Sequence, residues 1–366
     1  MNLYERFGKC MDGIKGIRPP FVHNFGPLPE TLTRWREEGA FKSPDEWFWR
    51  VGFEGEPDKQ IGNWVEINGY ICPSFEEKIL EESDEARIII DAFGVKKQIM
   101  KKSSSIPHFM SWPVHNHDTW QEVKLRLDPD STERLGADWE KYKKSLGASP
   151  LPNFIGGLPC GFFGAPRELL GVENQLVLFY DDPALMEDIL RQLTKLWLGL
   201  WRKVVRELRV DYVFIWEDMC YRNGPLISPD LFRQFLLPCY GELIDGLKRE
   251  GVTRFFVDTD GNCEQLISLF IEGGVTGMLP FEIRAGMDIL KVRKQYPNLG
   301  IIGGLDKTIF AQGPPAVDNQ LRIVRQMLEY GRYIPTFDHT VPPDVSWNQY
   351  LDFCLRLKEL VYAAGE

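Results

Sequence analysis

Short apolar runs that end in carboxylates recur along the second half of the chain. In the clearest of them, Phe255-Phe256-Val257 is followed by Asp258, Asp260 and a Gly-Asn turn. The run is too short for a helix, whereas the apolar residues that follow it recur at helical spacing. The sequence therefore predicts a strand, a turn and a helix, with two acids at the carboxyl end of the strand.

The same order of apolar run, polar turn and helix occurs four more times. The runs and the polar residues that end them are Tyr212 to Ile215 with Glu217 and Asp218, Gly277 to Pro280 with Glu282, Gly300 to Gly304 with Asp306, and Tyr333 to Phe337 with Asp338 and His339. Strands that alternate with helices predict a parallel sheet, because each parallel crossover needs a connecting helix. We expect an α/β fold of the (β/α)8 TIM barrel type, in which the carboxyl ends of the strands form the active-site face.

The first part of the chain is less regular. Residues 21–26 are predicted to form the first strand, and residues 27–150 an aromatic-rich elaboration beside the barrel, with a β-hairpin or meander over residues 86–100. Residues 152–157 predict a further barrel strand, Pro183 opens the longest helix, and the last helix runs from Ser346. The eighth barrel strand is expected within residues 60–100. We interpret residues 1–366 as one barrel domain.

Composition excludes several classes of protein. With 366 residues and 43% hydrophobic content the chain can bury a sizeable core, and its formal charge of −10 argues against a nucleic-acid-binding protein. No run approaches the roughly 20 apolar residues that span a bilayer. The seven cysteines are scattered without a CxxC pair, which indicates reduced thiols and a cytoplasmic protein.

Several motifs occur in an order that resembles a known superfamily. They are Gly156-Gly157 through Gly164-Ala165-Pro166, Ser228-Pro229-Asp230 with Pro238 downstream, Asp260-Gly261-Asn262, Gly303-Gly304-Leu305-Asp306, and Asp338-His339 before Pro342-Pro343. This order, over about residues 150–362, resembles the uroporphyrinogen decarboxylase-like superfamily, which also contains corrinoid-linked methyltransferases for methanol, methylamine and chloromethane. The resemblance implies a (β/α)8 barrel with its site at the carboxyl face.

The chain departs from the decarboxylases at the segment after the first strand, and it has no clear match for their catalytic aspartate segment. Those enzymes carry an arginine-rich segment after the first strand, which holds the carboxylate groups of the substrate, whereas residues 21–27 contain no arginine. The nearby cationic candidates are Arg167, Arg222 and Arg284. A tetrapyrrole with many carboxylates needs several cations, so the resemblance favours the methyltransferase branch over decarboxylation of uroporphyrinogen.

The methyltransferase branch binds zinc through a His-x-Cys pair and a further Cys at strand ends. The resemblance places Asp258, Asp260 and His339 at these positions, a set that leaves a coordination position open and suits zinc, iron or manganese. In the alternative interpretation, the acids cap the following helix and hydrogen-bond the histidine. His115 and His117, which share one face of an extended segment, form a weaker candidate for a metal site.

We predict two further groups of site residues. The catalytic candidates are Glu217, Asp218, Asp260 and His339, and the substrate-binding candidates are His23, Asn24, Arg167, Trp216, Glu282, Asp306 and Asp338. For Glu217 and Asp218 the alternative is a structural acid satisfied by backbone amides at the barrel top. A dense group of carboxylates would raise some of their pKa values and suit one of them to proton donation.

These observations lead to one functional hypothesis and two alternatives. We expect a methyltransferase that moves a methyl group between a small methylated or methoxylated compound, or a thiol, and the corrinoid of a partner protein, assisted by a metal. The alternatives are a metal-independent decarboxylase and a binding protein without catalytic activity. By analogy with the superfamily, the protein is also a candidate homodimer.

Overall fold

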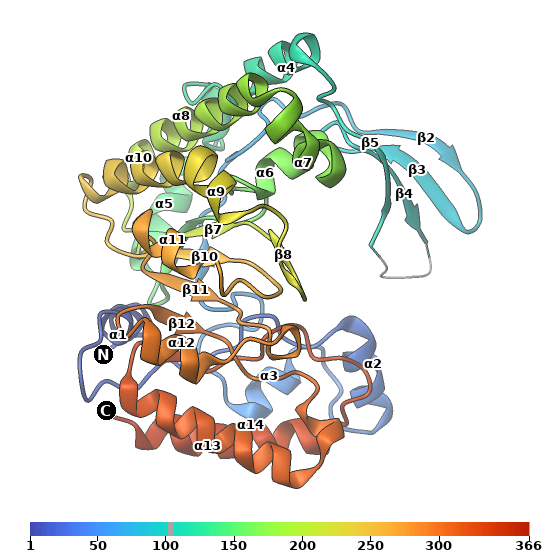
Figure 1. The fold of residues 1–366 in the computed structure, drawn as a ribbon. Helices are drawn as coiled ribbons and strands as arrows, with labels where there is room; N and C mark the ends of the chain where they lie inside the picture. The colour runs from blue at the N-terminus through green and yellow to red at the C-terminus, as the bar shows by residue number, and fades with distance from the viewer. Residues whose placement is uncertain (102–105, 366) are drawn as a thin grey trace.

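A curled parallel sheet of seven strands forms most of the barrel wall in this computed structural model, which describes residues 1–101 and 106–365 (Figure 1). The strands, in their order across the sheet, are β1 (Asn63–Trp64), β6 (Asn153–Gly156), β7 (Tyr212–Trp216), β10 (Phe255–Asp258), β11 (Gly277–Leu279), β12 (Gly300–Ile302) and β13 (Tyr333–Ile334). Their order in space follows their order in the chain, as expected for a (β/α)8 barrel. β1 lies within residues 60–100, where the eighth strand is expected from the sequence.

Residues 21–26 do not form the strand that the sequence predicts. These residues belong to no strand, because the backbone of Phe21 bonds to a loop instead: its N–H donates to Glu54 Oε2 at 2.8 Å and its carbonyl accepts the Glu54 N–H at 2.8 Å. The segment nevertheless stands between β13 and β1, since Asn24 lines one space with Thr336 and another with Trp64. It therefore completes the barrel wall without a hydrogen-bonded ladder.

Helices cover the outside of the barrel. Those that follow barrel strands are α6 (Gly164–Leu170), α7 (Val172–Asp181), α8 (Pro183–Glu207), α9 (Pro229–Leu231), α10 (Leu237–Lys248), α11 (Ile267–Glu272), α12 (Ile289–Gln295), α13 (Pro314–Tyr330) and α14 (Trp347–Ala363). The predicted starts at Pro183 and Ser346 are confirmed: the Asp182 and Ser346 side chains cap α8 and α14. Within the described ranges, no helix combines the length and the apolarity needed to cross a membrane.

The region before β6 adds helices and a second sheet. Its helices are α1 (Leu3–Met11), α2 (Pro29–Glu37), α3 (Glu46–Val51), α4 (His117–Lys124) and α5 (Trp139–Ala148). Its antiparallel sheet consists of β2 (Lys78–Glu82), β3 (Ala86–Ile90), β4 (Lys96–Met100) and β5 (His108–Ser111), and a small ribbon of β8 (Cys220–Tyr221) and β9 (Gly224–Pro225) follows β7. The meander predicted over residues 86–100 is confirmed as β3 and β4, and this sheet projects away from the barrel (Figure 1).

The inside of the barrel is packed in layers. The amino-terminal helix α1 closes the amino end, where its apolar side chains pack against inward-facing residues of the wall. This lower layer consists of Leu3, Phe7, Cys10, Met11, Val22, Ile61, Leu151, Tyr212, Phe256, Leu279, Ile302 and Ile334. Because side chains alternate between the two faces of an extended chain, the residues two positions after Val22, Tyr212, Phe256 and Ile334 also point inward. We call Asn24, Phe214, Asp258 and Thr336 the upper layer.

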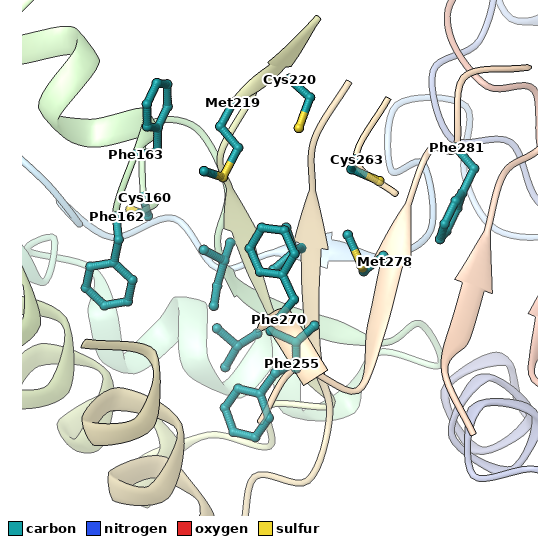
Figure 2. Packing of buried hydrophobic residues seen from close by; sticks show 14 of the residues in the cluster. Cys160, Phe162, Phe163, Met219, Cys220, Phe255, Cys263, Phe270, Met278 and Phe281 are labelled. Atoms are coloured by element: carbon teal, nitrogen blue, oxygen red, sulfur yellow. The ribbon is translucent and has the colours of Figure 1, made fainter. Parts of the chain in front are cut away.

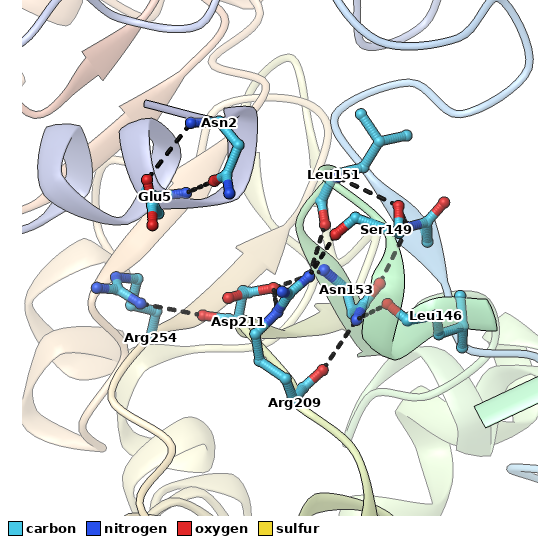
Figure 3. A network of polar contacts seen from close by, with 10 residues as sticks. Asn2, Glu5, Leu146, Ser149, Leu151, Asn153, Arg209, Asp211 and Arg254 are labelled. Atoms are coloured by element: carbon cyan, nitrogen blue, oxygen red, sulfur yellow. Dashed lines mark hydrogen bonds and ion pairs between the residues drawn. The ribbon is translucent and has the colours of Figure 1, made fainter. Parts of the chain in front are cut away.

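Two further groups of contacts hold the wall. Figure 2 shows the outer packing of β7, β10 and β11, with Phe255 and Phe270 against the strands and Cys220 and Cys263 beyond their carboxyl ends. At the amino ends of β6 and β7, the Asn153 N–H donates to Asp211 Oδ2 and the Asp211 N–H to the Asn153 carbonyl, both at 2.8 Å (Figure 3). These paired bonds fix the register of two strands that carry site residues at their other ends.

Truncation of a side chain in the lower layer should destabilise the amino end of the barrel. Phe7 is fully buried, so Phe7→Ala should leave a cavity and lower the free energy of unfolding by about 3–5 kcal/mol. Denaturant unfolding followed by tryptophan fluorescence would measure the loss. Val177→Ala, at an exposed helical position, serves as the control and should change it by less than about 0.5 kcal/mol.

Candidate active site

Three polar side chains of the upper layer each carry a buried atom that has no hydrogen-bond partner among the described residues. Asn24, Asp258 and Thr336 are 5%, 7% and 3% exposed, and Asn24 Nδ2, Asp258 Oδ1 and Thr336 Oγ1 have no partner. Buried polar atoms normally have hydrogen-bond partners, because removing them from water without a partner costs free energy. A group of unpaired atoms at the active-site end of a barrel therefore indicates a place for a ligand. Sequence reasoning missed Thr336, although its position two residues after the inward-facing Ile334 was a usable signal.

Asp260 and His339 meet above this layer. Asp260 Oδ2 lies 3.7 Å from His339 Nε2, and each side chain stays about one-third exposed. The His339 ring stacks on Phe25, with centroids 4.9 Å apart, and its Nδ1 lies 2.9 Å from Thr340 Oγ1. Burial, and then the positive charge of Lys307, lower the pKa of His339. The pair therefore consists of a solvent-accessible carboxyl group and a histidine that favours its neutral form.

The carboxyl groups of this face raise each other's pKa values. Burial raises the pKa of Asp260 to about 7, with further contributions from Asp218 and Glu282. Burial, and then the charges of Asp218 and Asp260, hold the pKa of Asp258 well above its usual value. At neutral pH a substantial fraction of Asp260 thus carries a proton that it can donate.

Glu282, Asp306 and Asp338 stabilise the loops around the mouth. Glu282 accepts the Gly261 N–H at 2.9 Å and pairs with Lys307 Nζ at 3.3 Å. Asp338 accepts backbone N–H groups of Ile283 and Lys307, and burial raises its pKa to about 6. Asp306 accepts from the backbone and hydroxyl of Thr308 and from Gln312. All three carboxylates therefore have bonds to the protein itself.

The Glu217 carboxylate is fully buried and has four donors. It accepts the backbone N–H groups of Phe162, Phe163 and Gly164 at 2.9, 2.5 and 3.0 Å, and the Tyr240 hydroxyl. The close approach depends on glycine, since a Cβ at Gly164 would lie 2.4 Å from the Trp216 carbonyl oxygen. This arrangement matches the alternative in which Glu217 is a structural acid, with its oxygens occupied by backbone amides.

Asp218, Arg167 and Trp216 form a connected group beside it. Arg167 donates to the Asp218 carbonyl at 3.0 Å and lies 3.7 Å from Asp218 Oδ2. The same guanidinium stands 4.6 Å from the centre of the Trp216 ring. Asp218 itself has a φ of +42°, a backbone conformation that non-glycine residues adopt at a cost. Its side chain is held at the mouth by these contacts.

The histidines of the first part of the chain lie away from the upper layer. His23 alternates with Asn24 and packs among Trp47, Phe48 and Phe53, where burial lowers its pKa to about 4. His117 Nε2 lies 2.8 Å from Asp182 on the surface. These positions remove the basis for a metal site at His115 and His117, and they place His23 behind the barrel wall.

The predicted metal ligands are only partly brought together. No group of three or more His, Cys, Asp or Glu side chains in the described part of the chain is arranged to hold a metal ion. Asp260 and His339 approach each other, but Asp258 belongs to the layer beneath them. The expected zinc or other divalent metal therefore does not fit Asp258, Asp260 and His339 as they stand, and we derive no chemical step through it.

A cavity of about 520 Å³ opens beside the upper layer. Four aromatic side chains line it together with the charged residues Asp58, Lys59 and Glu66, and Asn24 reaches it from the neighbouring segment. The lining includes Asn24, Gln60, Trp64, Phe154, Tyr212 and Phe214. The mouth of the barrel thus has an acidic side, built by β10 to β13, and an aromatic side, built by β1, β6 and β7.

These features define a class, a barrel of enzyme type with its polar groups gathered at the carboxyl face. The family model for uroporphyrinogen decarboxylase (URO-D) matches residues 86–359. The chain belongs to the uroporphyrinogen decarboxylase (URO-D) family. No curated protein sequence matches it.

Two solved structures match the chain at low sequence identity. A methyltransferase from Methanosarcina mazei is 14% identical with a TM-score of 0.59, and the match covers 98% of this chain and 99% of that one. A B12-independent methionine synthase from Shewanella sp. W3-18-1 is 12% identical with a TM-score of 0.42, covering 91% of this chain and 87% of that one. The first of these matches agrees with the (β/α)8 barrel predicted from the sequence.

The hydrogen bonds of Glu217 predict that its replacement lowers the stability of the folded protein. In Glu217→Gln an amide replaces an oxygen that accepts buried N–H groups, so the free energy of unfolding should fall by about 3 kcal/mol. Tyr240→Phe removes one donor and should cost about 1 kcal/mol. Both values would come from denaturant unfolding. A Glu217→Gln protein with wild-type stability would contradict the structural role.

Proposed function

We propose that this protein is a methyltransferase that takes a methyl group from a small methylated or methoxylated substrate and passes it to the corrinoid of a partner protein. The observation that carries the proposal is the environment of Asp260. This acid is accessible, and its pKa of about 7 lets it donate a proton at neutral pH. Membership of the URO-D family and the fold shared with a methyltransferase support the proposal.

The chemistry assigned to this chain is activation of the leaving group. The nucleophile of the acceptor forms a bond to the methyl carbon while the bond from that carbon to the substrate oxygen breaks. The electron pair of the broken bond goes to the oxygen, which takes the proton from Asp260. His339, 3.7 Å away and held by Phe25, orients the carboxyl group. Protonation makes the oxygen a better leaving group and avoids an alkoxide or phenolate in a carboxylate-lined site.

The charges of the mouth argue against a polycarboxylate substrate. Arg167 already pairs with Asp218 and Lys307 with Glu282, so both of these cations are neutralised within the protein. A substrate with many carboxylates would instead meet Asp258 and Asp260. The alternative reaction, decarboxylation of a smaller carboxylate with Asp260 as the proton donor, makes a different product and is distinguished by the following experiment.

Replacement of Asp260 tests the reaction. The protein would be mixed with reduced corrinoid proteins and a panel of methylated substrates, and methyl transfer followed by the absorbance spectrum of the corrinoid and by the demethylated product. Asp260→Asn should lower the rate about 10²-fold or more, because the proton donor is lost. Asp84→Asn, at an exposed turn between β2 and β3, should leave it unchanged. Release of carbon dioxide from a carboxylated substrate without methyl transfer would replace this function with the alternative.

The raised pKa of Asp260 also predicts how activity and stability depend on pH. The acid form is required, so kcat/KM should fall as pH rises above about 7. The folded protein binds this proton more tightly than the unfolded chain, so Asp260 should lower the free energy of unfolding of wild type as pH rises from about 4 to about 7. Asp260→Asn cannot ionise and should therefore gain more in melting temperature over wild type at pH 8 than at pH 5. An equal difference at both pH values would contradict the raised pKa.

A further inference from the structure

We infer that the substrate is an aryl methyl ether, with its ring against the aromatic side of the mouth and its ether oxygen between Asp260 and the layer of Asn24, Asp258 and Thr336 beneath it. This inference deepens the proposed function and rests on it. Two independent observations carry it: an aromatic cavity too large for a one-carbon substrate, and three buried polar atoms without partners.

The aromatic wall is preformed. The Phe154 ring lies 4.9 Å from Tyr212, with an interplanar angle of 16°, and 5.8 Å from Phe214. The Trp64 indole N–H donates to the Gly156 carbonyl at 2.8 Å, which fixes the ring, yet Trp64 remains 47% exposed. Large aromatic side chains that are held in place and still open to a cavity favour a flat apolar ligand over a hydrated ion.

The size of the cavity sets a lower limit on the ligand. Its volume of about 520 Å³ falls within the range of roughly 300–1,000 Å³ typical of small-molecule pockets. A one-carbon donor such as methanol or methylamine would leave most of this space to water beside aromatic surfaces. A ring-bearing compound would bury those surfaces, and the apolar area removed from water would contribute to binding.

The unpaired atoms favour a ligand with an oxygen atom at the end away from the aromatic wall. Asn24 Nδ2 is a donor and needs an acceptor, and the Thr336 hydroxyl can donate to the same atom. An ether or phenol oxygen offers the lone pairs, whereas a methylated ammonium group offers none and would face the Asn24 N–H. Asp258, 7% exposed and with its Oδ1 unpaired, completes the group. Asn24 lines the aromatic cavity as well, so one residue joins the two halves.

A pair of matched ligands tests the oxygen contact. 2-Methoxyphenol and 2-ethylphenol have nearly the same shape, but only the first carries the ether oxygen. Calorimetric titration without any corrinoid protein should give tighter binding of 2-methoxyphenol to wild type, by about fivefold or more, from hydrogen bonds of about 1 kcal/mol each. Asn24→Leu, of similar volume, should abolish this preference while 2-ethylphenol still binds. An unchanged preference in Asn24→Leu, or no preference in wild type, would overturn the assignment of the oxygen.

The aromatic wall is tested with a second variant. Trp64→Ala should weaken the binding of both phenols about tenfold. Trp49→Ala, at another exposed tryptophan outside the cavity, should not. Thermal unfolding of each variant shows whether it is folded. Tighter binding of tetramethylammonium than of 2-methoxyphenol, or no binding of either phenol to wild type, would overturn the ligand class.

The same measurements separate this inference from the proposed function. Methyl transfer from a substrate without a ring, combined with no binding of the phenols, would overturn the aryl ether and leave the methyltransferase. Binding of the phenols with the predicted variant effects, but without methyl transfer to any corrinoid protein from 2-methoxyphenol, would overturn the methyltransferase and leave the pocket assignment.

Discussion

The two-residue alternation of the barrel wall is the constraint on which this site depends. On the extended segments that carry Val22, Phe256 and Ile334, the residues two positions further along also point inward, whatever their polarity, because successive side chains of an extended chain face opposite sides. In this way Asn24, Asp258 and Thr336 reach the interior, whereas His23, one position away from Asn24, is buried among Trp47 and other aromatic rings outside it. A difference of one position along the chain thus decides whether a side chain faces the interior of the barrel or packs behind its wall.

Two acids of the same mouth illustrate how environment assigns a role. Glu217 is fully buried and accepts three backbone N–H groups and the Tyr240 hydroxyl, so its charge is compensated within the protein. Asp260 meets His339 at 3.7 Å, keeps contact with solvent and lies among other carboxyl groups that raise its pKa to about 7. The first arrangement holds the loop after β6 against β7, and the second supplies an acid for chemistry.

Membership of the URO-D family does not decide the reaction, because function depends on the site that the barrel carries. Here two cations of the mouth, Arg167 and Lys307, are paired with acids of the protein, and the opposite wall is aromatic. A large anionic substrate would have to compete with these acids for both cations. A neutral substrate with an apolar body and one oxygen matches both walls.

The sequence by itself determined the barrel and the end at which its polar residues gather, because repeated apolar runs followed by acids and helices are a local pattern. It placed Asp258, Asp260, Glu282 and His339 on one face for the same reason. Only the tertiary structure decided which acids are satisfied by backbone, that Asp258 lies beneath Asp260 and His339, and that Thr336 completes the upper layer. Those outcomes depend on contacts between strands far apart in the chain and on burial, which no spacing of residues along the sequence contains.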